Sequence, residues 1–162
     1  MTAIVVLGST NMDLVAYVAR APRRGETVPG RAFRTIPGGK GANQAVAAAR
    51  AGGDVAMIGA VGTDAFGELL RHTLQVSGVD TDLLHTADGP SGTAHIVVDD
   101  EGGNAIVVVP GANGTVTALG PGDEALVATP DTQLRQHELP LSLGGGGAPA
   151  PPPPRLPRPP GR

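Results

Sequence analysis

Three features of the sequence predict an α/β fold with a parallel sheet. Aliphatic, β-branched runs at 3–7 and 55–61 predict strands that are buried on both faces. Each run is followed, further along the chain, by a segment of helical composition, within 37–50 and at 65–76. A pair of extended segments joined by an acidic, glycine-containing turn then occupies residues 93–109. Alternating strands and helices, followed by a hairpin, are typical of an α/β domain with a flap at its edge.

Composition limits the class of protein. A chain of 162 residues is long enough for one domain, whose core must be aliphatic because the chain has only one Tyr, two Phe and no Trp. The absence of Cys excludes disulfides and thiolate metal sites. A net charge of -3 disfavours a nucleic-acid partner. We expect a cytoplasmic protein without a membrane partner, because no apolar run suits a signal peptide or a membrane span.

Polar residues follow the first predicted strand, Ala3–Leu7. Asn11 and Asp13 lie beyond its carboxyl end, which is where open α/β sheets bind ligands. Because they are two residues apart, both side chains point the same way if this segment is extended. An Asx turn held by the same side chains is the alternative. The extended stretches 14–18 and 26–36 predict short, partly exposed strands of a flap beside this site.

The segment 37–50 is the most informative part of the chain. Three glycines occur among its first five residues, and an alanine-rich helix follows. Lys40, the only lysine, and Asn43 project from the start of this helix, where free backbone N–H groups also face a ligand. The loop matches neither a Walker A motif nor a dinucleotide fingerprint. It predicts a site for a polyhydroxylated small molecule, with a strand-to-helix turn that binds nothing as the alternative.

The remaining local signals predict structure and not chemistry. Thr63 or Asp64 is expected to cap the helix 65–76. His72 on this helix has no second ligand at metal spacing, so we expect a surface histidine. The acidic segment 99–104 lacks the spacing of a calcium loop and is expected to be a solvated hairpin turn.

Four motifs occur in order along the chain: GSTNMD at 8–13, GETV at 25–28, GGKGANQA at 38–45 and VGTDAFG at 61–67. Taken together, they resemble the N-terminal half of the PfkB family of carbohydrate kinases. The resemblance covers residues 3–113 and implies a Rossmann-like α/β domain with a small β lid over a sugar site.

The resemblance also implies site residues and a reaction. Asp13 would accept hydrogen bonds from sugar hydroxyls that Lys40 and Asn43 contact as donors. The reaction would transfer a phosphoryl group from ATP, with Mg²⁺ and a monovalent cation such as K⁺, to the 5-hydroxyl of D-ribose; fructose or a nucleoside is the alternative acceptor. A homodimer through the lid is also implied. The sugar-binding residues would be Asn11, Asp13, Gly38, Gly39, Lys40, Asn43 and Glu138.

The chain departs from the family at the catalytic centre. The family's Gly-Ala-Gly-Asp motif, whose Asp is the general base, does not occur in the sequence. Gly120–Asp123 does not replace it, because Pro121 lacks the N–H that an anion hole uses. We therefore expect no catalytic, cofactor-binding or metal-binding residue, poor cofactor binding, and negligible kinase activity by the chain alone. A sugar-binding or dimerising remnant and a defective, frameshifted product are the alternatives.

The predicted organisation has two parts. Residues 1–142 form the N-terminal part of the kinase-like domain, with lid strands at about 11–37 and 91–110. Residues 143–162 form a disordered Gly/Pro-rich tail. Within the first part, the strand predicted at 132–138 is expected to be weak or exposed, because Gln133, Arg135 and His137 lie on one of its faces.

Overall fold

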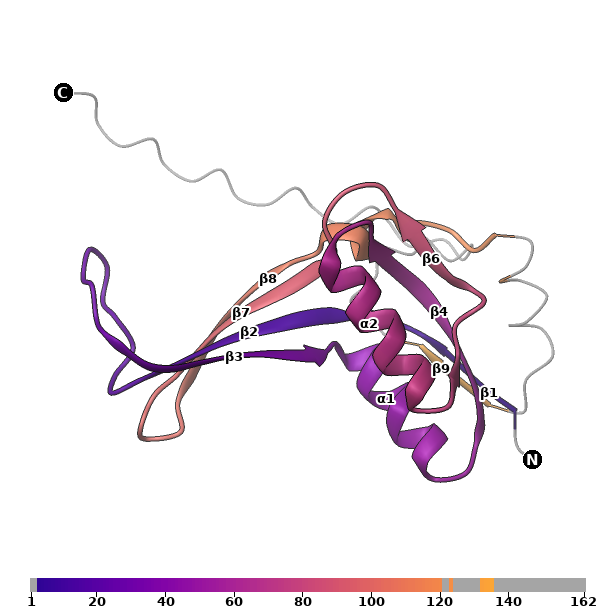
Figure 1. Ribbon diagram of the computed structural model, residues 1–162, viewed down its shortest axis with the longest axis horizontal. Helices are drawn as coiled ribbons and strands as arrows, with labels where there is room; N and C mark the ends of the chain where they lie inside the picture. The colour runs from indigo at the N-terminus through magenta and orange to yellow at the C-terminus, as the bar shows by residue number, and fades with distance from the viewer. Residues whose placement is uncertain (1–2, 121–122, 124–131, 136–162) are drawn as a thin grey trace, which may run out of the picture.

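The computed structural model describes residues 3–120, 123 and 132–135. Its strands form two β-sheets (Figure 1). One sheet carries the helices and forms the body of the molecule, and the second projects from the body and is called the lid below. The lid has four strands: β2 (Asn11–Val18), β3 (Gly30–Gly38), β7 (Gly92–Val98) and β8 (Asn104–Val109).

The body sheet contains β1 (Ala3–Leu7), β4 (Asp54–Gly62), β5 (Val79–Asp80), β6 (Leu84–Ala87) and β9 (Thr132–Arg135). Its order is β5-β4-β1-β9, with β6 also pairing with β4, and all of these pairings are parallel. The central strands β1 and β4 are continuous apolar runs because both faces of the sheet are covered.

Two helices cover one face of the body sheet, α1 (Lys40–Arg50) and α2 (Ala65–Val76). Leu70 and Leu74 of α2 are buried in the same apolar cluster as Met57 of β4. The alanines of α1 keep this helix thin, which allows it to lie close to the sheet and to α2.

The opposite face of the body sheet is covered by η1 (Gly111–Thr115), a short 3₁₀ helix that follows the lid. Ala112 of η1 is buried in a second cluster with Val5 and Leu7 of β1. Alternate residues of β1 therefore enter different clusters, as the period of a strand requires.

The lid sheet has the order β3-β2-β7-β8. Its strand β2 is antiparallel to β3 and parallel to β7, and β7 and β8 form an antiparallel hairpin. Residues that pair across strands share a face, so Asp13, Ile36 and Ala94 lie on one side of the lid. We call this side the Asp13 face and the opposite side, which carries Leu14 and His95, the Leu14 face.

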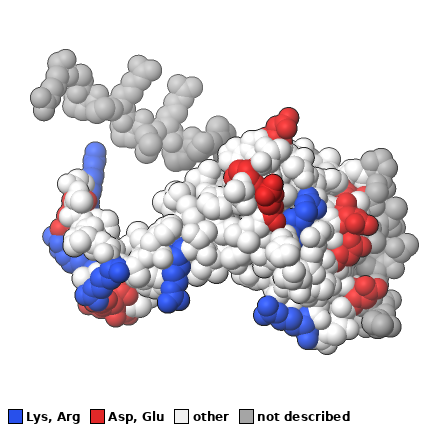
Figure 2. Space-filling model, viewed as in Figure 1, with Lys and Arg blue, Asp and Glu red and all other residues white. Residues whose placement is uncertain are grey.

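Charged side chains gather at the far end of the lid, away from the body (Figure 2). Arg20 forms an ion pair with Glu26 in the β2–β3 connection, and Arg31 is 2.7 Å from Asp100 of the β7–β8 turn. The tip of the lid is therefore polar and solvated, whereas its middle carries mostly apolar side chains.

The structure confirms the predicted α/β class with a parallel sheet. The helix predicted at 65–76 has these bounds, and the helix predicted within 37–50 runs from Lys40 to Arg50. The strands β5 and β6 and the helix η1 were not predicted.

The strand predicted at 132–138 forms over Thr132–Arg135, where it pairs in parallel with β1 at the end of the described strand order. Leu134 packs against the core. The expectation that the polar face of this strand makes it weak or exposed stays a prediction. Glu138 and the tail at 143–162 lie outside the described residues.

The helices were also compared with the requirements of a membrane span. Within residues 3–120, 123 and 132–135, neither α1 nor α2 is long and apolar enough to cross a membrane.

Candidate functional site

The glycine-rich loop before α1 packs directly on the connection between β1 and β2. Gly39 has a φ of 97°, and a Cβ atom added there would lie 2.7 Å from the Cα of Thr10. A Cβ at Gly41 would lie 2.7 Å from the Cα of Gly8. The N–H of Ala42 donates to the Ser9 carbonyl at 3.1 Å. Only glycines allow this approach, which places the start of α1 beside the carboxyl end of β1.

Asn11 and Asp13 lie on the same face of β2, as their spacing predicts. They belong to a strand, so the alternative Asx turn does not form. The Asp13 carboxylate lies against Gly38, where an added Cβ would be 2.5 Å from Oδ2. Partial burial raises the pKa of Asp13 above its ordinary value by desolvating the carboxylate.

Asn11 is 6% exposed and is held by a second asparagine that sequence reasoning missed. Asn113 of η1 donates from Nδ2 to Asn11 Oδ1 at 2.8 Å and to the Thr10 carbonyl at 3.0 Å. The Thr10 N–H donates back to Asn113 Oδ1 at 3.0 Å. No local pattern indicated this contact, since the two asparagines are 102 residues apart.

Lys40 and Asn43 lie in the first turn of α1, and both are exposed. Gly39 is the N-cap of the helix and provides no side-chain cap. The N–H of Ala42 in this first turn is used by the Ser9 carbonyl, so the donors considered for a ligand are the two side chains. Asn43 lines a small cavity together with Thr10 and Gly38, which places it beside the loop that contacts β2.

The lid supplies an apolar wall next to these polar groups. Ala94 pairs with Asp13, and Val108 pairs with Ala94, so all three lie on the Asp13 face. Val108 also lines a cleft of about 230 Å³ between the lid and the body. The other residues that line this cleft are Ser9, Asn11, Pro110 and Asn113.

A second polar junction ties the lid to α2. Asp64 caps α2 by accepting from the Gly67 N–H at 2.9 Å, and it also accepts from Ser91 Oγ at 2.6 Å and from the Ser91 N–H at 3.0 Å. Ser91 Oγ in turn accepts from the Gly62 N–H at 2.9 Å. Burial alone would raise the pKa of Asp64, but these hydrogen bonds outweigh it and lower that pKa.

The remaining candidates do not join this site. Asp123 is buried, accepts from the Gly120 N–H at 2.9 Å and lies 3.1 Å from His85 Nε2, which gives it a structural role. His72 is exposed on α2. Among the described residues, no three His, Cys, Asp or Glu side chains gather in a way that could hold a metal ion.

The described part of the site therefore combines one partly buried carboxylate, a fixed amide, an amine and a helix start beside an apolar wall. A carboxylate accepts from two adjacent hydroxyl groups, while amide and ammonium groups donate to them. This chemistry suits a small polyol with one less polar side.

Comparisons with known proteins point to one family. A family model described as pfkB family carbohydrate kinase matches residues 1–139. The chain is 52% identical over 118 residues to the ribokinase of Bacillus subtilis, an alignment that covers 72% of this chain and 40% of that protein. The chain spans about 40% of the length of the ribokinases of Bacillus subtilis and Lactococcus lactis.

Solved structures agree with the sequence comparison. Ribokinase from Cryptococcus neoformans in complex with ADP superposes with a TM-score of 0.76 at 38% identity, covering 86% of this chain and 43% of that one. Arabidopsis thaliana ribokinase complexed with ribose and ATP superposes with a TM-score of 0.77 at 33% identity, covering 86% of this chain and 46% of that one.

Proposed function

Because the chain belongs to the PfkB family of carbohydrate kinases, we propose that it carries the sugar-binding part of an ATP-dependent ribokinase. The whole enzyme would phosphorylate D-ribose at its 5-hydroxyl. The fold that surrounds the site is the ribokinase fold.

One observation carries this proposal: the loop 38–41 brings the start of α1 against the strand that bears Asn11 and Asp13. Asp13 would accept from two hydroxyls of the sugar, and Asn11, Lys40 and Asn43 would donate. The backbone at Gly38 and Gly39 would also contact the sugar, as the family resemblance implies. Glu138, which is outside the described residues, is retained as a further sugar contact by family resemblance alone.

We further propose that this chain binds ribose without turning it over. Its sequence contains no Gly-Ala-Gly-Asp motif to supply a general base. ATP, Mg²⁺ and a monovalent cation such as K⁺ would serve the whole enzyme, and the chain alone would bind them poorly. ADP production by the purified chain that requires both ATP and ribose, and that Asp13→Asn abolishes, would contradict this part of the proposal.

Calorimetric titration of D-ribose into the purified chain tests the binding function. Saturable binding is expected, and Asp13→Asn should weaken it at least about tenfold, since the amide can accept at only one atom and repels a donor at the other. Asp88→Asn is the matched control, because Asp88 is exposed and lies outside the site. Equal affinity of wild type and Asp13→Asn would refute the site. Fructose and a nucleoside, titrated in parallel, should bind more weakly than ribose.

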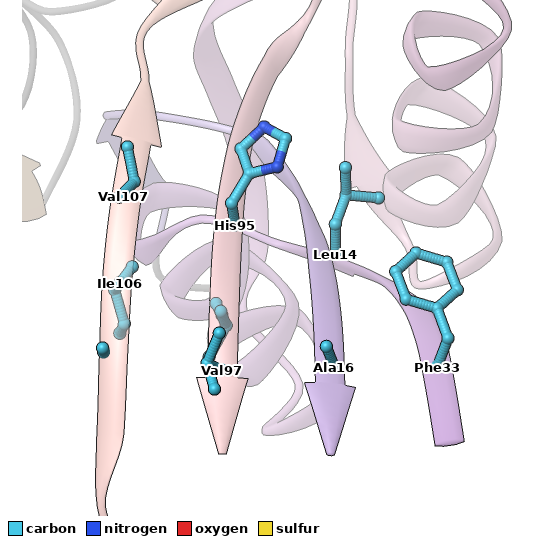
Figure 3. A pocket seen from close by; sticks show the side chains of 9 residues that line it. Leu14, Ala16, Phe33, His95, Val97, Ile106 and Val107 are labelled. Atoms are coloured by element: carbon cyan, nitrogen blue, oxygen red, sulfur yellow. The ribbon is translucent and has the colours of Figure 1, made fainter. Parts of the chain in front are cut away.

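The Leu14 face of the lid favours a homodimer. It bears a shallow apolar pocket that is shared by all four lid strands (Figure 3). Phe33 and Val107 are each 64% exposed on this sheet, an unusual position for large apolar side chains on a monomer. We propose that a second copy of the chain covers this face. The residues that Figure 3 labels at the pocket are Leu14, Ala16, Phe33, His95, Val97, Ile106 and Val107.

A further inference from the structure

The side chain of Asn113 connects both sides of the cleft between the lid and the body. It is 3% exposed and uses both of its polar atoms. Its Oδ1 accepts from the Thr10 N–H, and its Nδ2 lies within hydrogen-bond distance of the Thr10 carbonyl, the Pro110 carbonyl and Asn11 Oδ1. These four contacts join η1, the end of the lid and the start of β2 in one network.

This network fixes which way each amide points. A backbone N–H can only donate and a backbone carbonyl can only accept, so Thr10 and Pro110 determine which atom of Asn113 is oxygen and which is nitrogen. The Nδ2 of Asn113 then has to meet an oxygen of Asn11, at 2.8 Å. The Nδ2 of Asn11 is consequently the atom at the other side of that amide, available to a ligand in the cleft that both asparagines line.

Gly92 keeps the two asparagines in contact. A Cβ atom added at Gly92 would collide with Asn113 Nδ2 and Asn11 Oδ1 and would lie 2.9 Å from the Pro110 carbonyl oxygen. A side chain at this position would therefore separate the two amides. Gly92 pairs with Asn11 in the lid sheet, so the position that lacks a side chain lies directly beside the hydrogen bond between the two asparagines.

We propose that Asn113 is a positioning residue that orients the Asn11 amide so that its Nδ2 donates to a hydroxyl of the bound sugar. The inference rests on the proposed sugar-binding function and adds a residue that does not itself touch the sugar. Asn113 acts through Asn11, because its own donor and acceptor atoms are already used within the protein.

The variant Asn113→Asp tests this directly. It has the same shape, but it replaces the donor Nδ2 by an oxygen that would face the oxygens of Thr10, Pro110 and Asn11. The Asn11 amide should turn over to donate to the new carboxylate and present its Oδ1 to the sugar. We expect an approximately tenfold loss of D-ribose affinity, the scale of one hydrogen bond to a buried group. Asn104→Asp, at the exposed first residue of β8, is the control and should keep wild-type affinity.

A double-mutant cycle separates positioning from a general loss of structure. If Asn113 acts through Asn11, Asn113→Asp should cost affinity in the wild type and almost nothing in an Asn11→Ala background. Equal losses in both backgrounds would overturn the proposal. If Asn113→Asp fails to fold by circular dichroism, Gly92→Ala serves in the same cycle. Its control is Gly30→Ala, a strand glycine whose added Cβ meets only the Tyr17 carbonyl, at 3.7 Å.

The orientation of the Asn11 amide can also be measured by NMR in the absence of sugar, independently of the proposed function. In NMR spectra of the ligand-free chain, the signal lost in Asn11→Ala identifies the Asn11 side-chain NH₂ group. That signal should shift in Asn113→Asp or Gly92→Ala and stay in place in Asn104→Asp, whether or not ribose binds. In the wild type, the Asn113 NH₂ protons should exchange slowly with water. An unchanged Asn11 signal, or fast exchange at Asn113, would overturn the orientation; absence of ribose binding with the expected NMR result would instead refute the proposed function.

Discussion

Asp13 is partly buried, and it is also the proposed acceptor of hydrogen bonds from the sugar hydroxyls. Its carboxylate lies against Gly38 on the Asp13 face, and desolvation raises its pKa. Because the folded chain then binds a proton more tightly than the unfolded chain, Asp13 lowers the stability of the fold as pH rises through the window between its ordinary and raised pKa. Above the raised pKa the contribution is constant, and the carboxylate is ready to accept hydroxyl hydrogen bonds.

The pH dependence of ribose affinity follows from this shift. Affinity should fall as pH decreases through the raised pKa of Asp13, at a higher pH than the one at which an exposed aspartate would lose its charge. Calorimetric titrations at a series of pH values measure the midpoint. In Asp13→Asn the remaining weak affinity should not depend on pH in this window. A wild-type midpoint at or below the ordinary aspartate pKa would contradict the role of burial.

Gly39 and Gly52 share a backbone conformation but differ in their surroundings. Both Gly39 and Gly52 have positive φ, 97° and 90°, but only Gly39 touches neighbouring backbone. Either change to Ala should cost roughly 1–2 kcal/mol for the strained backbone. Gly39→Ala should cost about 1–3 kcal/mol more, because its Cβ would press on Thr10 and Asn11. Chemical denaturation of the two variants measures the difference. Equal losses would mean that the loop can move away from β2.

At the scale of elements, the junction between α2 and the lid depends on Asp64. Its carboxylate both caps the helix and holds Ser91 immediately before β7. Because these hydrogen bonds lower the pKa of Asp64, its stabilising contribution is fully present above the ordinary aspartate pKa and is lost only as pH falls through the lowered value.

Asp64→Ala should destabilise the chain by about 2 kcal/mol at neutral pH, from the lost cap and the unpaired Ser91. Denaturant unfolding monitored by circular dichroism measures this loss. Asp88→Ala, at an exposed site without a cap, should change stability by less than about 0.5 kcal/mol. Similar stabilities of Asp64→Ala and Asp88→Ala would show that the junction is not a source of stability.

The same elements show what the sequence could predict. The helix 65–76 was predicted with its bounds because its cap, its apolar side and its flanking glycines are local signals. The helix η1 was missed because it is short, glycine-rich and stabilised by contacts with β1 and β2 that are distant in the chain. Asn113 was missed for the same reason, whereas Asn11 and Asp13 were predicted as site residues because their polar pair follows a buried strand, and their placement on one face of β2 agrees with their spacing.

At the scale of the whole molecule, the lid exposes an apolar sheet face that the body does not cover. Val107 on the lid and Val76 on α2 offer a matched pair, since they are 64% and 68% exposed. Val107→Lys should weaken or abolish a dimer, because a second copy would have to bury the charge. Val76→Lys should leave the dimer intact. Analytical ultracentrifugation measures both; a monomeric wild type, or equal dissociation of both variants, would contradict the proposed dimer.

The central claim is that the loop 38–41 and the start of β2 together form a ribose site. The most direct measurement is an NMR titration of the ¹⁵N-labelled chain with D-ribose. We predict saturable shifts confined to the backbone amides of residues 10–14, 38–43 and the neighbouring lid strands, and their loss in Asp13→Asn. Saturable shifts elsewhere, shifts that persist in Asp13→Asn, or no response at all from a folded chain would contradict the claim.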